Sequence, residues 1–379
     1  MSPRLGDRAL FPDLAARSYL AHCAISPIPA PARAAAVENL DSYARLGVGA
    51  VPRWLEQRAA LRDAFGRLVG ARGEDIALVA NTTTGVIDVA FSIPWRAGDR
   101  VVLFEGEFPA NVTPWQQAAA TFGLAIVRVP LQGFGRGGDP RDDGLARLAE
   151  VLRGGARLVA VSAVQFSTGL AMPLREIAAL CRAHGAELFV DGIQAVGVVP
   201  VDVGVGIDYL TCGSHKWLMG AEGCAALYVA PERARALVPR LAGWISHEEP
   251  FGFLWGAAPL RHDRPFKTAA GVFEGAAANG AGLAALGAAV GLLEALGVPA
   301  IVDHVQRWHD AIEPALVERG FTSLRGGPGA RSGILALDAP AGVDVQAVVK
   351  GLAARGVVVT APENHLRVAE AYIALGDVE

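Results

Sequence analysis

Between about residues 50 and 230, short apolar segments alternate regularly with stretches of helical periodicity. The apolar segments have the length of strands and are 75–80, 100–104, 125–129, 157–162, 187–192, 206–213 and 223–229. The helical stretches are 60–70, 82–93, 109–123, 143–153 and 174–185. Strands that are apolar throughout need cover on both faces, which the helices between them can provide. The pattern therefore predicts the α/β class, with a mostly parallel sheet covered by helices on both sides.

The second part of the chain has a different pattern of expected secondary structure. Beyond residue 275 come long helices rich in Ala and Leu, followed by shorter apolar segments. A chain of 379 residues, 52% of them hydrophobic, exceeds the usual size of one domain and has ample core material. We expect a large α/β domain over 17–260 and a smaller α+β domain formed by 261–379 together with 1–16. The stretch 243–267, rich in Trp, Phe, Pro and Gly, is expected to be a junction or an active-site loop.

Charge and composition exclude several classes of partner. The net charge of −4 offers no electrostatic attraction to nucleic acid or to an anionic membrane. No apolar stretch suits a signal peptide or a membrane span, so we expect a cytoplasmic protein that acts on a small polar molecule. The absence of CxxC spacing favours reduced core thiols over disulfides or a metal site for the four cysteines, Cys23, Cys181, Cys212 and Cys224.

One glycine-rich segment imitates a dinucleotide-binding fingerprint. "GFGRGG" at 133–138 fits GxGxxG and follows an expected strand. However, "DPRDDG" separates it from the next helix, so the third glycine cannot bring that helix close to the strand. We therefore expect a flexible surface loop here and no dinucleotide site.

Two charged residues stand at the ends of expected buried strands. Lys216 lies in "CGSHKWL", directly after one such strand, and Asp191 ends another, in "FVDGIQAVG". Burying an ammonium group costs several kcal/mol, so Lys216 is either a surface lysine whose amine reaches water or a working amine. Asp191 is either a turn residue or a ligand-binding carboxylate, and Gln194 follows it closely. Open α/β sheets bind ligands at the carboxyl ends of their strands, where these side chains are expected.

An amine and a carboxylate at one edge of a sheet suit pyridoxal phosphate better than other cofactors. That cofactor needs a lysine for its Schiff base and a carboxylate that keeps its pyridine nitrogen protonated. "NTTTG" at 81–85 begins a helix, and helix N-termini bind phosphate through backbone N–H groups and hydroxyls. An ordinary N-cap would use the same residue types. Together with Lys216 and Asp191, the segment predicts a pyridoxal-phosphate site.

Longer motifs resemble a known family. The stretch 190–232, "VDGIQAVGVVPVDVGVGIDYLTCGSHKWLMGAEGCAALYVAPE", is similar to the core of the class V aminotransferase family of pyridoxal-phosphate enzymes. That family includes cysteine desulfurases, selenocysteine lyases and isopenicillin N epimerase-like enzymes. The resemblance covers nearly the whole chain, from "SYLAHCAISPIP" to "HLRVAEAYIAL". It implies the aminotransferase-type fold, pyridoxal 5′-phosphate as cofactor, an amino-acid substrate and a homodimer with shared active sites.

The resemblance implies a role for each site residue. Lys216 carries the Schiff base and serves as general base at Cα, and Asp191 pairs with the pyridine nitrogen. Gln194 contacts the ring hydroxyl. Arg367 receives the substrate carboxylate, the alternative being a surface ion pair of little energetic value.

The remaining roles concern the ring face and the phosphate. Phe108, or its neighbour Pro109, covers the face of the ring where many relatives have histidine. The phosphate is held by Thr82, Thr83, Thr84, Ser214 and His215. His215 is also counted among the catalytic residues.

Departures from the family pattern narrow the reaction. Desulfurases carry a reactive cysteine shortly before the C-terminal "LRV", where this chain reads "VVVTAPENHLRV" and has no cysteine after Cys224. "AAAN" at 276–279 replaces the usual "GTPN", and Phe166 stands near a position that is often asparagine. We therefore expect a lyase or an epimerase-like enzyme that works through Schiff-base and quinonoid intermediates, without a protein persulfide. An aminotransferase and a cofactor-binding protein without turnover are the alternatives.

Overall fold

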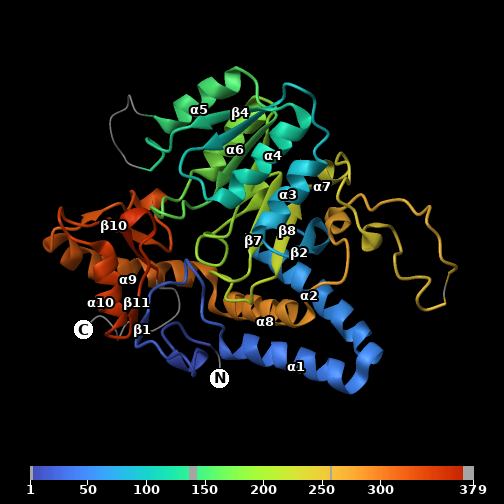
Figure 1. Cartoon of the computed structure of the whole chain (residues 1–379), viewed down its shortest axis with the longest axis horizontal. Helices are drawn as coiled ribbons and strands as arrows, with labels where there is room; N and C mark the ends of the chain where they lie inside the picture. Colours follow the sequence, from blue (N-terminus) through green and yellow to red (C-terminus); the bar gives the residue numbers. More distant parts are fainter. Residues whose placement is uncertain (1–2, 136–142, 257, 370–379) are drawn as a thin grey trace.

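The computed structural model describes residues 3–135, 143–256 and 258–369, which form three sheets surrounded by helices (Figure 1). The largest sheet has seven strands in the order β2-β8-β7-β6-β5-β3-β4. These strands are β2 (Ile76–Val79), β3 (Arg100–Phe104), β4 (Ala125–Val129), β5 (Leu158–Ser162), β6 (Glu187–Asp191), β7 (Tyr209–Gly213) and β8 (Ala225–Val229). The pairings from β7 through to β4 are parallel, whereas β8 runs antiparallel to both of its neighbours. The mostly parallel sheet predicted from the sequence is confirmed.

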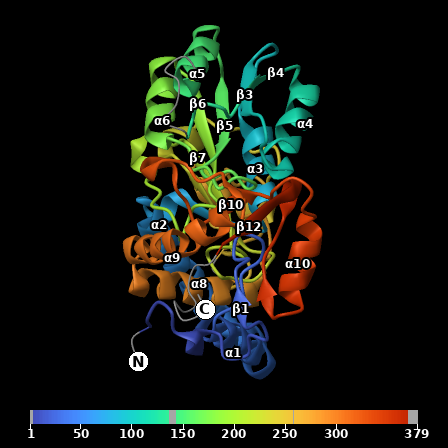
Figure 2. The same ribbon diagram turned by 90° about the vertical axis from the view of Figure 1, so that its left-hand side faces the viewer.

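Helices cover both faces of this sheet, with α5 and α6 on one side and α3 and α4 on the other (Figure 2). Their bounds are α3 (Thr82–Ser92), α4 (Thr113–Phe122), α5 (Gly144–Arg153) and α6 (Leu174–Ala183). Along β3, Val102 and Phe104 pack in the core that includes α5 and α6, while Val101 and Leu103 pack in the core beneath α3 and α4. A strand with two buried faces has no place for polar residues, which explains its continuous apolar sequence.

Long helices form the base of the molecule in Figure 1. α1 (Ala30–Leu46) and α2 (Val51–Val69) both pack on α8 (Gly280–Leu296), which is followed by α9 (Val298–Glu318); a short helix, α7 (Pro231–Ala234), lies beside the large sheet. Gly297 joins α8 to α9 with φ of +80°, a left-handed backbone that favours glycine, and the two helices meet at 77°. In the described ranges, no single helix has the length and apolar composition to cross a membrane, and only this bent pair meets both criteria when taken together.

The C-terminal part builds its own antiparallel sheet in the order β12-β10-β9. Its elements are β9 (Thr322–Ser323), β10 (Leu335–Asp338), α10 (Val345–Ala353), β11 (Val357–Val358) and β12 (His365–Val368). Leu335 and Leu337 pack with Trp308 of α9 and Val345 of α10 in a separate core. β1 (Ser18–Tyr19) pairs with β11, which draws the N-terminal segment to this part. The division into domains at 17 and 261 stays a prediction.

Three segments have a structure that the sequence pattern did not specify in detail. The helix expected over 109–123 is divided, because Val112 leaves helical backbone angles (φ −125°, ψ −56°) between a 3₁₀ turn at Pro109–Asn111 and α4. The glycine-rich segment forms a turn at 133–135, and its remaining residues lie outside the described ranges, as do residues 370–379 of the expected small domain. The stretch 243–267 leaves the body of the molecule as a long arm, yellow to orange in Figure 1.

Candidate active site

The carboxyl ends of β5, β6 and β7 lie side by side because these strands are parallel and paired in register. Ser162 at the end of β5 pairs with Asp191 at the end of β6, and Asp191 pairs with Thr211 of β7. β7 ends at Gly213, and Lys216 follows in the turn after it. The structure thus brings the predicted carboxylate and the predicted amine to one edge of the sheet.

Asp191 is a buried carboxyl, 2% exposed, whose Oδ1 accepts a hydrogen bond from the backbone N–H of Ile193 at 3.0 Å. Burial raises its pKa to about 6. The charge of Glu107 acts in the same direction, while the Ile193 hydrogen bond and the charge of Lys216 oppose it. No second hydrogen bond to this carboxylate occurs within the described residues. One oxygen is therefore available to a ligand donor.

Lys216 carries the amine that the sequence singled out. Its Nζ lies 5.5 Å from the centre of the Phe108 ring, and within the described part of the chain it forms neither a hydrogen bond nor an ion pair. Burial lowers the pKa of Lys216, the attraction of Asp191 raises it, and the positive charge of Arg367 lowers it further. A surface lysine would extend its amine into water, so the structure favours the working amine.

The amine and the carboxylate fit the two ends of a pyridoxal ring. Lys216 and Asp191 shift each other's pKa, yet they do not form an ion pair in the described ranges, so a gap separates Nζ from the carboxylate. An uncommitted amine and an uncommitted carboxylate oxygen are the groups that this cofactor requires.

Gln194 is held by protein contacts on both sides of its amide. Its Nε2 donates to the carbonyl of Cys23 at 2.9 Å, and its Oε1 accepts from Nε1 of Trp217 at 2.9 Å. A primary amide has two N–H donors, so one remains for the predicted ring hydroxyl. The predicted contact stays a prediction, and the structure adds that Gln194 fastens the N-terminal segment to the lysine turn.

The first turn of α3 lies next to the lysine turn. Thr82 is buried, and its Oγ1 accepts a hydrogen bond from the backbone N–H of Gly213 at 2.9 Å. Asn81 is the N-cap, since its Oδ1 accepts from the backbone N–H of Thr84 at 2.8 Å and from the Thr84 hydroxyl at 3.1 Å. Thr83 is exposed at the helix start. The predicted phosphate residues of this segment are therefore together, with Thr82 and Thr84 also serving local structure.

The other two predicted phosphate residues precede Lys216 directly. Ser214 is fully buried, and its hydroxyl donates to the carbonyl of Ala221. His215 is partly buried, and burial, reinforced by the charge of Lys216, lowers its pKa. A neutral imidazole is thus favoured next to the amine.

Arg367 reaches the site from β12, which belongs to the C-terminal three-stranded sheet. It is 6% exposed; its Nε donates to Oγ1 of Thr360 at 3.0 Å, and Nη1 donates to the carbonyl of Phe166. It is buried and forms no ion pair within the described residues, which argues against the alternative of a surface ion pair. A buried guanidinium with no carboxylate partner is suited to a carboxylate ligand.

Phe108 is the aromatic ring beside Lys216. Its ring is 44% exposed and meets that of Phe166 edge to face, with centres 5.2 Å apart. Pro109 begins the following 3₁₀ turn. The ring beside the amine therefore belongs to Phe108, the first of the two residues considered for the stacking position.

Sequence reasoning missed two residues at this edge. Glu107 is a buried carboxylate that raises the pKa of Asp191. Cys23 is fully buried; burial raises its pKa, and the charges of Arg367 and Lys216 oppose that shift. All four cysteines are free and buried, as predicted. No local pattern marks Cys23 as a site residue, because it reaches the site through the pairing of the N-terminal segment with the C-terminal part.

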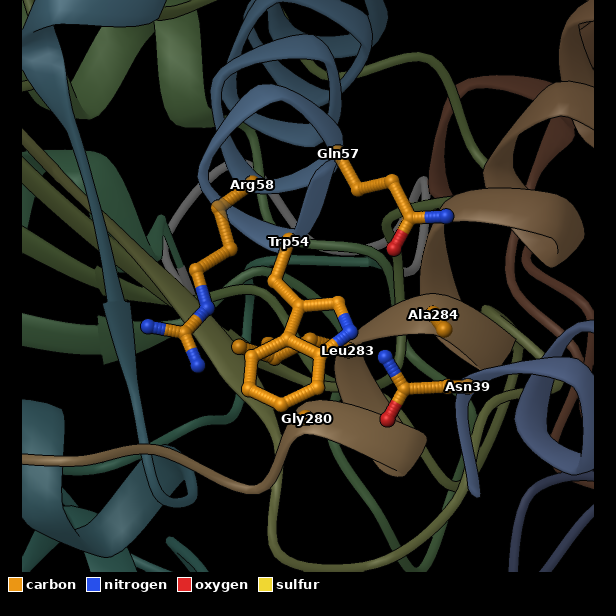
Figure 3. Close-up of a pocket in the computed structure, with 7 residues that line it drawn as sticks. All are labelled: Asn39, Trp54, Gln57, Arg58, Gly280, Leu283 and Ala284. Carbon is orange, nitrogen blue, oxygen red and sulfur yellow. The ribbon is translucent and has the colours of Figure 1, made fainter. Parts of the chain in front are cut away.

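A small cavity between α1, α2 and α8 shares no residue with this site. Figure 3 shows Trp54, Gln57 and Arg58 approaching it from α2 and Asn39 from α1, close to Gly280 of α8. Its volume is about 10 Å³, room for about one water molecule. It is too small to hold a cofactor.

Several known proteins resemble this chain in sequence or in structure. The uncharacterized aminotransferase YcbU of Bacillus subtilis (strain 168) is 29% identical over 338 residues, 87% of this chain and 84% of YcbU. A cysteine desulfurase of Klebsiella pneumoniae (strain 342) is 31% identical over 302 residues, 74% of this chain and 66% of the desulfurase. A mutant of C-DES, with glycine covalently linked to its PLP cofactor, matches with a TM-score of 0.87 at 24% identity over 98% of this chain and 96% of that chain. Another C-DES structure describes a cystine C–S lyase in complex with its product cysteine persulfide.

The fold and the site together define a pyridoxal-phosphate-dependent enzyme of the aminotransferase type. The chain belongs to the aminotransferase class-V family, whose sequence model matches residues 19–376. The predicted family, fold and cofactor are thereby confirmed, and the alternative of a binding protein without turnover is set aside. The roles of the individual site residues stay predictions.

Proposed function

We propose that this enzyme acts on an α-amino acid as a lyase or epimerase-type catalyst, with elimination at Cβ as the better supported reaction. The observation that carries the proposal is the Lys216 amine, which has no hydrogen-bond or ion-pair partner in the described ranges. It lies at the sheet edge with Asp191, and the charge of Arg367 is close enough to lower its pKa. An amine, an acid and a carboxylate-binding cation are the groups that amino-acid chemistry on this cofactor needs.

Bound pyridoxal phosphate supplies an electron sink for the electron pair released at the substrate Cα. Lys216 would hold the cofactor covalently through Nζ, and Asp191 would accept the pyridine N–H through its uncommitted oxygen. The N–H groups of the first turn of α3 would hold the phosphate, and the Ser214 hydroxyl would join them by turning its proton away from the Ala221 carbonyl. Phe108 would cover one ring face and exclude water from it.

Lys216 is proposed to move the proton at Cα. Burial lowers its pKa, so the neutral, proton-accepting amine is more abundant near pH 7 than in an exposed lysine. A two-base epimerisation needs a second proton donor on the face of Cα opposite Lys216, and Phe108, which is proposed to cover one ring face, has no proton to give. This difference supports a lyase over an epimerase.

Arg367 is proposed to orient the substrate by its carboxylate. Thr360 and the Phe166 carbonyl already hold two of its N–H groups, which fixes the guanidinium plane. The remaining N–H groups can then bind a carboxylate without a further loss of side-chain entropy.

The location of the thiols supports elimination without a protein-bound persulfide. The segment before Arg367 contains no cysteine, and the thiol of Cys23 is held neutral by burial, whereas a thiolate is the nucleophile that captures sulfur. C-DES, whose fold matches, is described as a cystine C–S lyase that forms cysteine persulfide. A sulfur-containing amino acid is therefore the first substrate to test. Aminotransferase activity is the second candidate, because YcbU is named as an aminotransferase.

To test the proposal, the purified holoenzyme is mixed with a panel of amino acids that includes cystine and cysteine. The products measured are sulfide, persulfide, ammonia, 2-oxo acids and racemised amino acid. A lyase is expected to release ammonia and a 2-oxo acid without an added amino acceptor. A requirement for an added 2-oxo acid would establish the aminotransferase instead. Lys216→Ala is the control that should abolish product formation in either case.

We further propose that the chain works as a homodimer with a large apolar interface. Large exposed apolar side chains lie on α1 and in or beside the stretch 243–267: Val37, Leu40, Leu46, Leu241, Trp244, Leu254, Trp255, Leu260 and Phe266. Apolar surfaces of this kind are suited to a second copy. Sedimentation should give twice the chain mass of 39.4 kDa. A fully active monomer would contradict the proposal.

A further inference from the structure

Glu107 is a buried carboxylate at the same sheet edge as Asp191. It follows β3 and is 8% exposed. Its Oε1 accepts hydrogen bonds from the backbone N–H of Ser162 at 2.7 Å and from Nε2 of Gln165 at 3.0 Å. Its Oε2 accepts from Nδ2 of Asn111 at 3.2 Å and from the hydroxyl of Ser162. Both oxygens are therefore fixed by the protein.

The hydrogen bonds to Glu107 favour its ionised form. Four donors point at the two oxygens. Three of them are N–H groups that cannot accept a proton from a neutral carboxyl, and only the Ser162 hydroxyl could turn to do so. The Asn111 amide is held in this orientation by Trp115, whose Nε1 donates to Oδ1 of Asn111 at 3.1 Å. Burial raises the pKa of Glu107 above its ordinary value, and the hydrogen bonds from Ser162, Gln165 and Asn111 offset part of that shift. Because these donors fix both oxygens, Glu107 holds its negative charge at a fixed place when it is ionised.

Among the residues that the structure describes, neither Glu107 nor Asp191 has a cationic partner in contact. No ion pair involves either carboxylate within the described residues. Ser162 connects the two, because it donates twice to Glu107 and pairs with Asp191 across β5 and β6. The charge of Glu107 raises the pKa of Asp191. Two buried carboxylates with no cation in contact create a negative potential, which the charge of Lys216 opposes at Asp191. Such a potential attracts a positively charged ligand group.

We propose that Glu107 is a positioning residue that acts through Asp191: its fixed negative charge strengthens the hold of Asp191 on the protonated pyridine nitrogen of the cofactor. Glu107 need not touch the cofactor, because charges act over several Å in a poorly solvated site. A nitrogen that keeps its proton withdraws electrons from the substrate more strongly. The inference rests on the proposed pairing of Asp191 with that nitrogen.

The test measures how strongly the cofactor-free protein prefers pyridoxal phosphate over its 1-deaza analogue. The analogue has C–H in place of the ring nitrogen, and it keeps the phosphate, the ring hydroxyl and the aldehyde. The ratio of the two dissociation constants therefore isolates the contribution of the nitrogen. Glu107→Gln removes the charge at nearly constant shape and is expected to lower the preference for pyridoxal phosphate about tenfold. A purely structural role would weaken both cofactors equally and leave the ratio unchanged.

Two further variants keep the test decisive. Ser162→Ala removes one hydrogen bond to Glu107 but leaves its charge, so the parental ratio should be retained. Gln165→Lys places an ammonium group beside Glu107 and should lower the ratio as Glu107→Gln does. Circular dichroism shows whether Glu107→Gln folds, since its amide would face four donors. If it does not fold, Gln165→Lys provides the test in its place. A parental ratio in the folded charge-neutralising variants overturns the proposal.

Asp191→Asn separates this inference from the function on which it rests. If Asp191→Asn lowers the ratio and the Glu107 and Gln165 variants do not, the role of Glu107 alone is refuted. If Asp191→Asn also leaves the ratio unchanged, the pairing of Asp191 with the pyridine nitrogen is refuted, and with it both proposals.

Discussion

The hydroxyl oxygen of Thr82 accepts a hydrogen bond from the backbone N–H of Gly213, and this bond joins the first turn of α3 to the last residue of β7. Helix and strand are in close contact here, since a Cβ added to Gly85 would lie 2.3 Å from Oγ1 of Thr211. The bond holds the helix N-terminus, which can bind a phosphate, at a fixed place beside the turn that carries Lys216. Because Thr82 is the acceptor, its own O–H remains able to donate to an anion.

Thr82→Val should destabilise the protein because it keeps the shape of the side chain and leaves the buried N–H of Gly213 without an acceptor. The expected loss in the free energy of unfolding is about 1–3 kcal/mol, measured by urea denaturation of the cofactor-free protein. Thr82→Ser retains the hydroxyl and is the matched control. Equal stability of the two variants would mean that the bond contributes nothing measurable.

Lys216 should be the site of covalent cofactor attachment. The protein as isolated is expected to be yellow, and borohydride reduction should add the cofactor mass to the peptide that contains Lys216. The chain has only three lysines, Lys216, Lys267 and Lys350, so peptide mapping by mass spectrometry is unambiguous. Lys267→Ala is the matched control, because Lys267 is also half-buried with a pKa lowered by burial. Label on Lys267 or Lys350 instead would refute the assignment.

Asp191 should make the cofactor-free protein less stable as the pH rises. Its pKa is about 6 in the folded protein against 3.8 ordinarily, so between about pH 4 and pH 6 the folded state binds a proton that the unfolded state has released. The free energy of unfolding then falls with rising pH in this window, by about 3 kcal/mol in total.

Asp191→Asn removes this titration. Its free energy of unfolding minus that of the parent should therefore increase from pH 4 to pH 7, with contributions from other groups cancelling in the difference. Denaturant titrations across the pH range measure it. A difference independent of pH would show that Asp191 keeps an ordinary pKa.

Arg367→Ala should impair the use of amino acids but not of simple amines. A substrate carboxylate left unpaired in a buried site should cost about 2–5 kcal/mol in kcat/KM. Arg367→Lys should rescue only part of the loss, because an ammonium group cannot match the two parallel donors of a guanidinium. The comparison uses an amino acid and its decarboxylated analogue with each variant. If the Ala variant discriminates between these two compounds as the parent does, Arg367 does not bind the substrate carboxylate.

The residues that the sequence identified are those whose chemistry conflicts with their apolar surroundings. Lys216 and Asp191 follow strands with no polar face, so a charge in either place requires a partner that the strand itself lacks. The strands and helices between 60 and 229 were likewise predictable, because their apolar residues recur with the spacing of a strand or a helix and Gly, Pro or Asn mark their ends. The antiparallel direction of β8 could not be predicted, because an apolar strand has the same sequence pattern in either direction.

Tertiary structure alone decided which distant segments complete the site. Glu107 has an ordinary surface-type sequence context, and only the adjacent ends of β3, β5 and β6 surround it with donors from Ser162 and Gln165. Cys23 and Arg367 come from opposite ends of the chain and meet beside Lys216 because β1 pairs with β11 and the N-terminal segment lies between the lysine turn and β12. The sequence by itself determined the residue types, the cofactor they suit and the strands that carry them, because these depend on local pattern. Burial and the electric field at each group depend on neighbours far apart in the chain, and these only the folded structure could decide.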